Sequence, residues 1–293
     1  MDERRGVVTR RDFVRATTGA AVGVSLFGVS WAGQPGRTPR PARVILVRDQ
    51  QVLDGSHQVD AGVLGRMLGE TVTLLAGEKS ARDAWRSLVS PADAVGLVPT
   101  DHLNPTHGEI VAAVRAALVD AGVPGDRVTL AQGGPQKAEA CTALIALPAL
   151  KAHWLTGIGT VLKNYITFSG HPSRYHGENN DRLGEIWQLP HVKGKTRLVL
   201  VDALRPLCDK GPQADPRYMW DYDGLIAGTD PVAVEAVCLK IITARREALK
   251  GEPWPISPPP LCVAMADKRY GLGTSRLEEI TIERSGPSEG ALV

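Results

Sequence analysis

The chain has 293 residues, with 34 Lys and Arg against 32 Asp and Glu and a formal net charge of +2. Its length suits one large α/β domain or two small ones and is sufficient to bury a core. Residues 1–32 hold five Arg and three acidic residues, so the remaining chain has 29 basic and 29 acidic residues. A balanced charge provides no electrostatic footprint for nucleic acid or an anionic membrane, and we expect neither as a partner.

The N-terminal segment has the features of an export signal. Arg10 and Arg11 begin a motif that resembles the twin-arginine signal. The uncharged run that follows is short and rich in Gly, Ser and Thr for a spanning helix, and small residues precede a cleavage site after Ala32. We therefore predict a signal peptide over 1–32 and a linker over 33–41. This implies export by the twin-arginine translocation machinery to the periplasm or the exterior, with no stable membrane insertion after cleavage.

Apolar, β-branched runs alternate with helical patterns from Ala42 onward. Strands are predicted over 42–49, 93–99, 126–132, 141–148, 196–204, 261–267 and 279–285, and a short helix over 60–69. Strands that are apolar at successive positions are buried on both faces. The pattern predicts an α/β fold over 42–285, in which helices cover both faces of a mostly parallel sheet, and a flexible tail over 286–293.

Two further segments predict longer helices. Residues 106–122 carry apolar residues at helical spacing, and Thr106 with Glu109 would form a capping box at the start. A second helix follows Asp230, which is a favourable cap, with Pro231 in the first turn, where a missing N–H costs nothing.

The four cysteines, at positions 141, 208, 238 and 262, are far apart in the sequence. No Cys-x-x-Cys motif occurs, so neither an iron–sulfur cluster nor a zinc ribbon is encoded by local spacing. One or two disulfides are compatible with an exported protein, but folding before export favours free, buried thiols.

Candidate catalytic residues follow the predicted strands, because ligands of parallel sheets bind beyond the carboxyl ends of the strands. Three of the predicted strands lead to His107, to Lys151 with His153, and to Asp202. We predict that these four side chains meet at one edge of the sheet. Histidine and lysine there would supply acid–base groups or metal ligands.

Residues 151–164 combine an apolar run with Gly157, Gly159, Lys163 and Asn164. The glycines would let the backbone approach a ligand, and a helix beginning there would offer free N–H groups to an anion. We predict that these four residues bind a cofactor or an anionic ligand. The segment is neither a dinucleotide fingerprint nor a phosphate-binding loop. The alternative interpretation is a strand, turn and helix whose lysine faces solvent.

The polar segment 168–182 contains His171 and His176. In a loop these two could join His153 around a transition metal, with a carboxylate such as Asp202. The alternative is a solvated loop or a lid over the pocket. No Gly-x-Ser-x-Gly elbow accompanies the histidines, which argues against a serine hydrolase.

Four motifs occur in a fixed order over about residues 42–250, namely PTH-x-EIV-x-AV, LP-x-LK-x-H…TG…LKN, LV-x-VDAL and GLIAG-x-DPVAVEAV. Their order resembles the bacterial domain-of-unknown-function family 362. The resemblance carries over to Thr106, His107, Lys151, His153, Lys163, Asn164, Asp202 and Asp230. Glu235 stands where the family has Asp, and the cysteine motifs that give some members iron–sulfur clusters are missing. Because the family has no settled activity, the resemblance predicts the fold better than the reaction.

These features lead us to expect an exported enzyme that uses metal- or cofactor-assisted chemistry, redox chemistry included, on a small anionic or oxygenated molecule. A transition metal is the expected cofactor, and a small molecule is the expected ligand. The alternative is a non-catalytic periplasmic protein that binds a metal or an anion.

Overall fold

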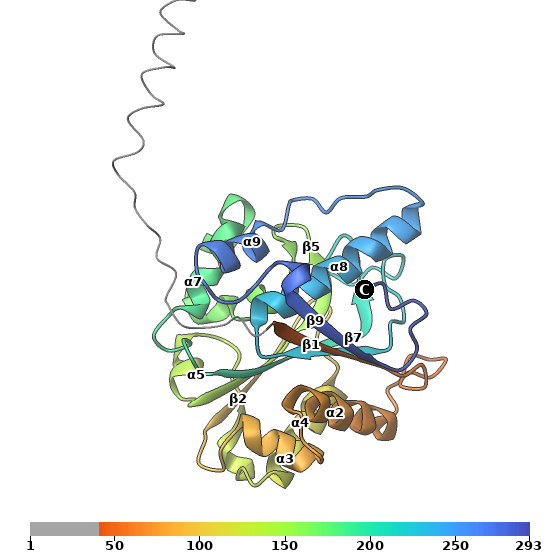
Figure 1. The fold of residues 1–293 in the computed structure, drawn as a ribbon. Helices are drawn as coiled ribbons and strands as arrows, with labels where there is room; N and C mark the ends of the chain where they lie inside the picture. Colours follow the sequence, from red (N-terminus) through yellow and green to blue (C-terminus); the bar gives the residue numbers. More distant parts are fainter. Residues whose placement is uncertain (1–40) are drawn as a thin grey trace, which may run out of the picture. The chain divides into compact units, whose positions relative to one another are not determined.

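The computed structural model describes residues 41–293, without the side chains of Glu178 and Asn179. The predicted signal peptide and nearly all of the predicted linker lie outside these residues. The described part has the predicted mixed α/β fold with a mostly parallel central sheet (Figure 1). None of its helices is both long and apolar enough to cross a membrane.

One sheet organises the domain. Its strands are β1 (Ala42–Arg48), β2 (Val95–Pro99), β3 (Val128–Leu130), β4 (Ala143–Leu147), β5 (Ala149–His153), β6 (Gly157–Ile158), β7 (Thr196–Leu207), β8 (Gly224–Gly228) and β9 (Ile280–Ser285). The order is β3-β2-β4-β7-β8-β1-β9, with β5 paired to β7 and to β6. Only β8 with its two neighbours and the β5–β6 pair run antiparallel among the paired strands of residues 41–293.

Helices cover both faces of the sheet (Figure 1). They are α2 (Ala61–Ala76), α3 (Ala81–Leu88), α4 (Gly108–Asp120), α5 (Pro135–Glu139), α6 (Val161–Asn164), α7 (Gly184–Trp187), α8 (Pro231–Lys250) and α9 (Leu261–Lys268). The 3-10 segments are η1 (Gly125–Arg127), η2 (Ile166–Ser169), η3 (Pro172–Tyr175), η4 (Gly177–Arg182) and η5 (Leu277–Glu279). Helices α2, α3 and α4 lie on one face, and α7, α8 and α9 lie on the other.

Strand β1 illustrates why the strands are apolar throughout. Val44 and Leu46 belong to the apolar cluster beneath α8, whereas Ile45 and Val47 belong to the cluster beneath α2 and α4. All four are almost inaccessible to solvent. Because successive side chains of a strand point to opposite faces, a sheet covered on both sides needs an apolar residue at every position.

The segment 261–267 was predicted as a strand and forms helix α9 instead. Cys262, Val263 and Ala266 are its buried residues, and this spacing places them on one face of a helix. A short apolar run does not distinguish a buried strand from a buried helix, which explains the wrong prediction.

The predicted capping box at Thr106 is also wrong. Helix α4 begins at Gly108, and the residue at its cap position, His107, makes no side-chain cap hydrogen bond. The Thr106 hydroxyl donates to the carbonyl of Leu147 and accepts the N–H of Thr100 at 3.0 Å. Thr106 therefore joins the ends of β2 and β4 instead of capping the helix.

Residues 286–293, predicted as a flexible tail, make contacts with the domain. The Tyr222 hydroxyl donates to the carbonyl of Ala291 at 2.6 Å, and Arg48 Nη1 donates to the carbonyl of Glu289 at 2.6 Å. Ala291 is buried. The four cysteines are free and buried, as the sequence favours.

Asp230 caps α8 as predicted and also holds a distant loop. Its Oδ1 accepts the N–H groups of Val232 and Ala233, both at 2.9 Å, and its Oδ2 accepts the N–H of Thr274 at 3.0 Å. The carboxylate therefore joins the start of α8 to the segment before β9.

Replacing Asp230 with Ala should lower the free energy of unfolding by about 2 kcal/mol, because the helix loses its cap and buried N–H groups lose their acceptor. Urea unfolding measures this loss. The matched control is Asp126→Ala, at an exposed position of η1, which should stay within about 0.5 kcal/mol of the wild type. Equal losses in the two variants would show that Asp230 is not a stabilising cap.

Candidate functional site

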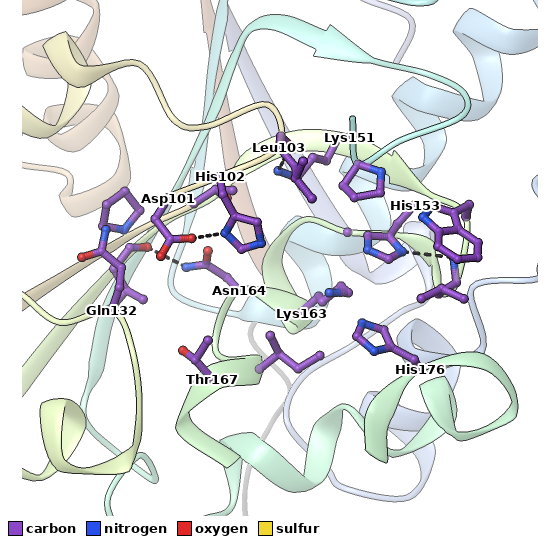
Figure 2. A pocket seen from close by; sticks show the side chains of 18 residues that line it. Asp101, His102, Leu103, Gln132, Lys151, His153, Lys163, Asn164, Thr167 and His176 are labelled. Atoms are coloured by element: carbon purple, nitrogen blue, oxygen red, sulfur yellow. Dashed lines mark hydrogen bonds and ion pairs between the residues drawn. The ribbon is translucent and has the colours of Figure 1, made fainter. Parts of the chain in front are cut away.

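A cavity of about 280 Å³ lies beyond the carboxyl ends of β2 and β5 (Figure 2). Six of the residues singled out in the sequence line it, namely Lys151, His153, Gly159, Lys163, Asn164 and His176. The chain reaches it from five places: the end of β2 with the loop that follows, Gln132 after β3, β5 with its turn and α6, the segment around η2 to η4, and Pro212 after β7. We call this cavity the lysine pocket.

Lys151 forms part of the wall of the lysine pocket and is itself buried. Its Nζ donates to the carbonyls of Leu103 and Asn104, both at 2.9 Å. Burial, together with the charge of Lys163, lowers the pKa of Lys151 to about 7, although Asp101 and Asp202 act in the opposite direction. Lys151 is thus held in place by two backbone oxygens, and with this pKa it is partly charged at neutral pH.

Lys163 projects from the single turn of α6 into the middle of the pocket (Figure 2). Among the side chains that the structure describes, no hydrogen-bond or ion-pair partner faces its ammonium, and burial lowers its pKa to about 8. The neighbouring Asn164 is held differently, because its Nδ2 donates to the carbonyl of Val98 in β2 at 2.7 Å. Lys163 is therefore the cation that remains available to a ligand.

His153 is buried in the pocket wall and is neutral at ordinary pH. Its Nδ1 accepts the N–H of Leu155 at 3.1 Å, which leaves the proton on Nε2. Burial, followed by the charges of Lys163, His176 and Lys151, lowers its pKa to about 3. The ring stacks on that of His176, with 5.7 Å between centroids, and burial likewise lowers the pKa of His176.

The two glycines serve close packing within the chain. Gly157 has a φ of 77°, and an added Cβ would lie 2.5 Å from the carbonyl oxygen of Pro258. An added Cβ at Gly159 would lie 3.0 Å from the Cβ of His153. Of the two, only Gly159 lines the pocket, so Gly157 is explained by its contact with the 258–260 segment rather than by a ligand.

The start of α6, predicted to offer free N–H groups to an anion, is already occupied by a carboxylate of the protein. Glu235 of α8 accepts the N–H groups of Val161 and Leu162 through Oε2, the latter at 3.0 Å. Glu235 is completely buried, and burial raises its pKa to about 7 against the effect of these hydrogen bonds. Its Oε1 has no partner among the described residues. In the sequence Glu235 stands out only as a replacement that keeps the charge, and no local pattern indicates this contact.

His107 and Asp202 come together, as predicted, but they do not line the lysine pocket. Asp202 Oδ2 accepts both the backbone N–H of His107 at 2.8 Å and its Nδ1–H at 2.7 Å, and Oδ1 accepts the N–H of Leu204. Burial would lower the pKa of His107, but the hydrogen bond and charge of Asp202 outweigh it and raise the pKa. The carboxylate also acts on Lys151, so the pair lies close behind the pocket wall.

The predicted metal ligands His153, His171 and His176 are not assembled. Across the described part of the chain, no group of three or more His, Cys, Asp or Glu side chains is arranged to hold a metal ion. His153 and His176 stack on each other, whereas His171 is exposed at the start of η3 and does not line the pocket. Two histidines in a polar segment were too weak a signal to predict where three imidazole rings lie.

Several lining residues were not among the predicted site residues, including Gln132, Trp154 and Thr167. Gln132 fell inside the predicted strand 126–132, whereas β3 ends at Leu130, so the strand end had to be placed correctly before the rule of reading past each strand could identify it. Asp101 and His102, which follow β2, form an exposed ion pair at the rim. Trp154 and Thr167 carry no sequence signal, because their place depends on the turns around α6 and η2.

Comparison with protein families identifies one segment. Residues 123–240 match the family model described as Domain of unknown function (DUF362). This chain resembles DUF362 over that range. The matched segment contains Lys151, His153, Lys163, Asp202 and Glu235, and it confirms the predicted family resemblance there, although it stops short of His107. No curated protein and no solved structure gives a significant match to the chain.

Asp202→Asn should shift the pKa of His107 downward, from above to below its usual value, because burial remains while the charge is lost. An NMR titration of the imidazole resonances measures this, with His107→Gln to assign the signal. In the wild type, the stabilisation from this pair is complete below the pKa of an unfolded histidine and is lost as the pH rises through the folded-state pKa. An unchanged His107 pKa in Asp202→Asn would contradict the assignment.

Glu235→Ala should lower the free energy of unfolding by about 3 kcal/mol or more, because two buried N–H groups lose their acceptor and a cavity forms. Glu235→Gln keeps an acceptor oxygen and should lose less in urea unfolding. Because the folded-state pKa of Glu235 is raised to about 7, the wild type should lose stability relative to Glu235→Gln between about pH 5 and about pH 8. Equal losses in the two variants would contradict the role of the carboxylate.

Proposed function

We propose that the protein is an enzyme that binds a small organic anion in the lysine pocket and carries out acid–base chemistry on it. The observation that carries the proposal is the Lys163 ammonium, which faces the cavity with no counter-charge among the described side chains. A partly buried ammonium without a partner is costly, and a bound carboxylate or phosphoryl group would remove that cost.

The neighbouring charges support an anionic ligand. Lys151 adds a second cation to the same pocket, and His153 is neutral with a hydrogen on Nε2. Both would favour an anion, the first by its charge and the second by a hydrogen bond. Among the described side chains that line the pocket, the carboxylate is Asp101, which contacts His102 and acts on Lys151 but not on Lys163.

The same residues support acid–base chemistry. A group exchanges protons most effectively when its pKa lies near the working pH, and the pKa of Lys163 is about 8. His153, with a pKa of about 3, does not take up a proton near neutral pH, so its role is to donate a hydrogen bond. The sequence led us to expect His153 as an acid–base group or metal ligand and Lys163 as part of a cofactor or anion site, whereas this proposal gives the proton exchange to Lys163.

We also propose that the protein acts outside the cytoplasm after export by the twin-arginine route. The support for this is the sequence of residues 1–32 alone, with its paired arginines and its small residues before position 33.

Small anions should stabilise the wild type, and Lys163→Met should weaken their binding roughly tenfold or more, as expected for loss of a charge-assisted hydrogen bond worth about 1.5–3 kcal/mol. Thermal shifts with phosphate and small carboxylates, at constant ionic strength, measure the effect. Binding should weaken from about pH 6.5 to about pH 9, because Lys151 and Lys163 lose their protons as the pH passes their pKa values of about 7 and about 8.

The control is Lys79→Met, which removes an exposed lysine far from the pocket lining and should bind anions like the wild type. Anion binding that is unchanged in Lys163→Met, or that does not depend on pH in this range, would show that the pocket is not an anion site.

A further inference from the structure

We propose that the Lys163 amine forms an imine with the carbonyl group of a 2-oxo acid whose carboxylate is held by Lys151. The proposal deepens the proposed function and rests on it, because it takes the anion in the lysine pocket to be a small oxo acid. It assigns different tasks to the two lysines.

The contacts of the two lysines separate these tasks. Lys151 Nζ already donates to the carbonyls of Leu103 and Asn104, both at 2.9 Å, and these bonds favour its charged form. One N–H remains for a carboxylate. Lys163 Nζ has no such bonds to the described residues, so a neutral amine there would keep its lone pair for reaction.

Lys163 also has the central position that a reacting group needs. Its charge contributes to the lowered pKa of Lys151, of His153 and of His176, which places it within reach of all three. Figure 2 shows it in the middle of the pocket, between Asn164 and the two histidines. Burial lowers the pKa of Lys163 to about 8, so part of this amine is free near neutral pH. The pKa of Lys151 is about 7, and a carboxylate bound beside it would raise that pKa and keep its ammonium charged.

The reaction balances without an oxidant or a reductant. The Lys163 nitrogen attacks the carbonyl carbon, a C–N bond forms, and the carbonyl oxygen takes up a proton to give a carbinolamine. The C–O bond then breaks and the oxygen leaves as water, carrying the two hydrogens that the amine gives up. The neutral His153 can donate a hydrogen bond from Nε2 to this oxygen as charge develops on it.

The size of the pocket favours a short substrate. A cavity of about 280 Å³ is at the lower limit of ordinary small-molecule sites, and much of its lining is occupied by polar and charged groups. A 2-oxo acid combines the two features that this pocket addresses, a carboxylate for the fixed cation and an adjacent carbonyl for the free amine. Pyruvate is therefore a suitable probe.

The test is reductive trapping on the purified full-length chain. Pyruvate with sodium cyanoborohydride should give one adduct per chain, located on Lys163 by peptide mass mapping. Trapping should be faster at about pH 8 than at about pH 6, because the free amine is the reacting form. Lys163→Arg should lose the adduct, and the exposed-lysine control Lys79→Arg should keep it.

The outcomes separate this inference from the proposed function. Adducts distributed over surface lysines, with no preference for Lys163 in the wild type, would overturn the imine. If pyruvate still raises the melting temperature in that case, and Lys163→Met abolishes the rise, the anion pocket stands without the imine. If pyruvate neither binds nor labels Lys163, and phosphate does not bind either, both proposals fail. Mapping on the wild type keeps the test valid even if a variant does not fold.

Discussion

The position of Lys163 in the lysine pocket depends on one buried carboxylate. Glu235, on the long helix α8, accepts the first two N–H groups of α6 and so fixes a helix of only four residues. A helix this short has little stability of its own, and its orientation must come from tertiary contacts. Trp187 adds one, because its Nε1 donates to the carbonyl of Leu162 at 3.1 Å. Through these contacts the core of the domain determines where Lys163 points.

The sequence predicted the sheet and the main polar groups because both follow simple rules. Apolar runs gave most of the strands, and reading past their ends found Lys151 and His153 in one pocket and His107 beside Asp202. The sequence did not predict β5 as a strand of its own, because the predicted strand ended at Pro148 and Lys151 and His153 were placed just after it. Nor did it predict α3, whose buried residues are only Ala84 and Trp85.

The remaining differences come from long-range contacts that no local pattern reveals. Thr106 has Glu109 at the spacing of a capping box, yet its hydroxyl donates to the carbonyl of Leu147, 41 positions away. The first N–H groups of α6 were predicted to be free to bind a ligand, yet they donate to Glu235, more than seventy positions further along the chain. In both places a polar group has two satisfactory partners, and the fold determines which one it meets.

The contacts of Lys151 also determine the shape of the loop that follows β2. Leu103 and Asn104, whose carbonyls it binds, both adopt left-handed backbone conformations with φ of 51° and 68°. Such conformations are unfavourable for residues other than glycine and persist where surrounding contacts hold them. Lys151 therefore holds the backbone of residues 103–104 in place and also contributes a charge to the pocket wall. Related chains with a lysine at position 151 would keep this loop conformation beside the pocket. Chains without it would differ in both the shape of the loop and the charge of the pocket.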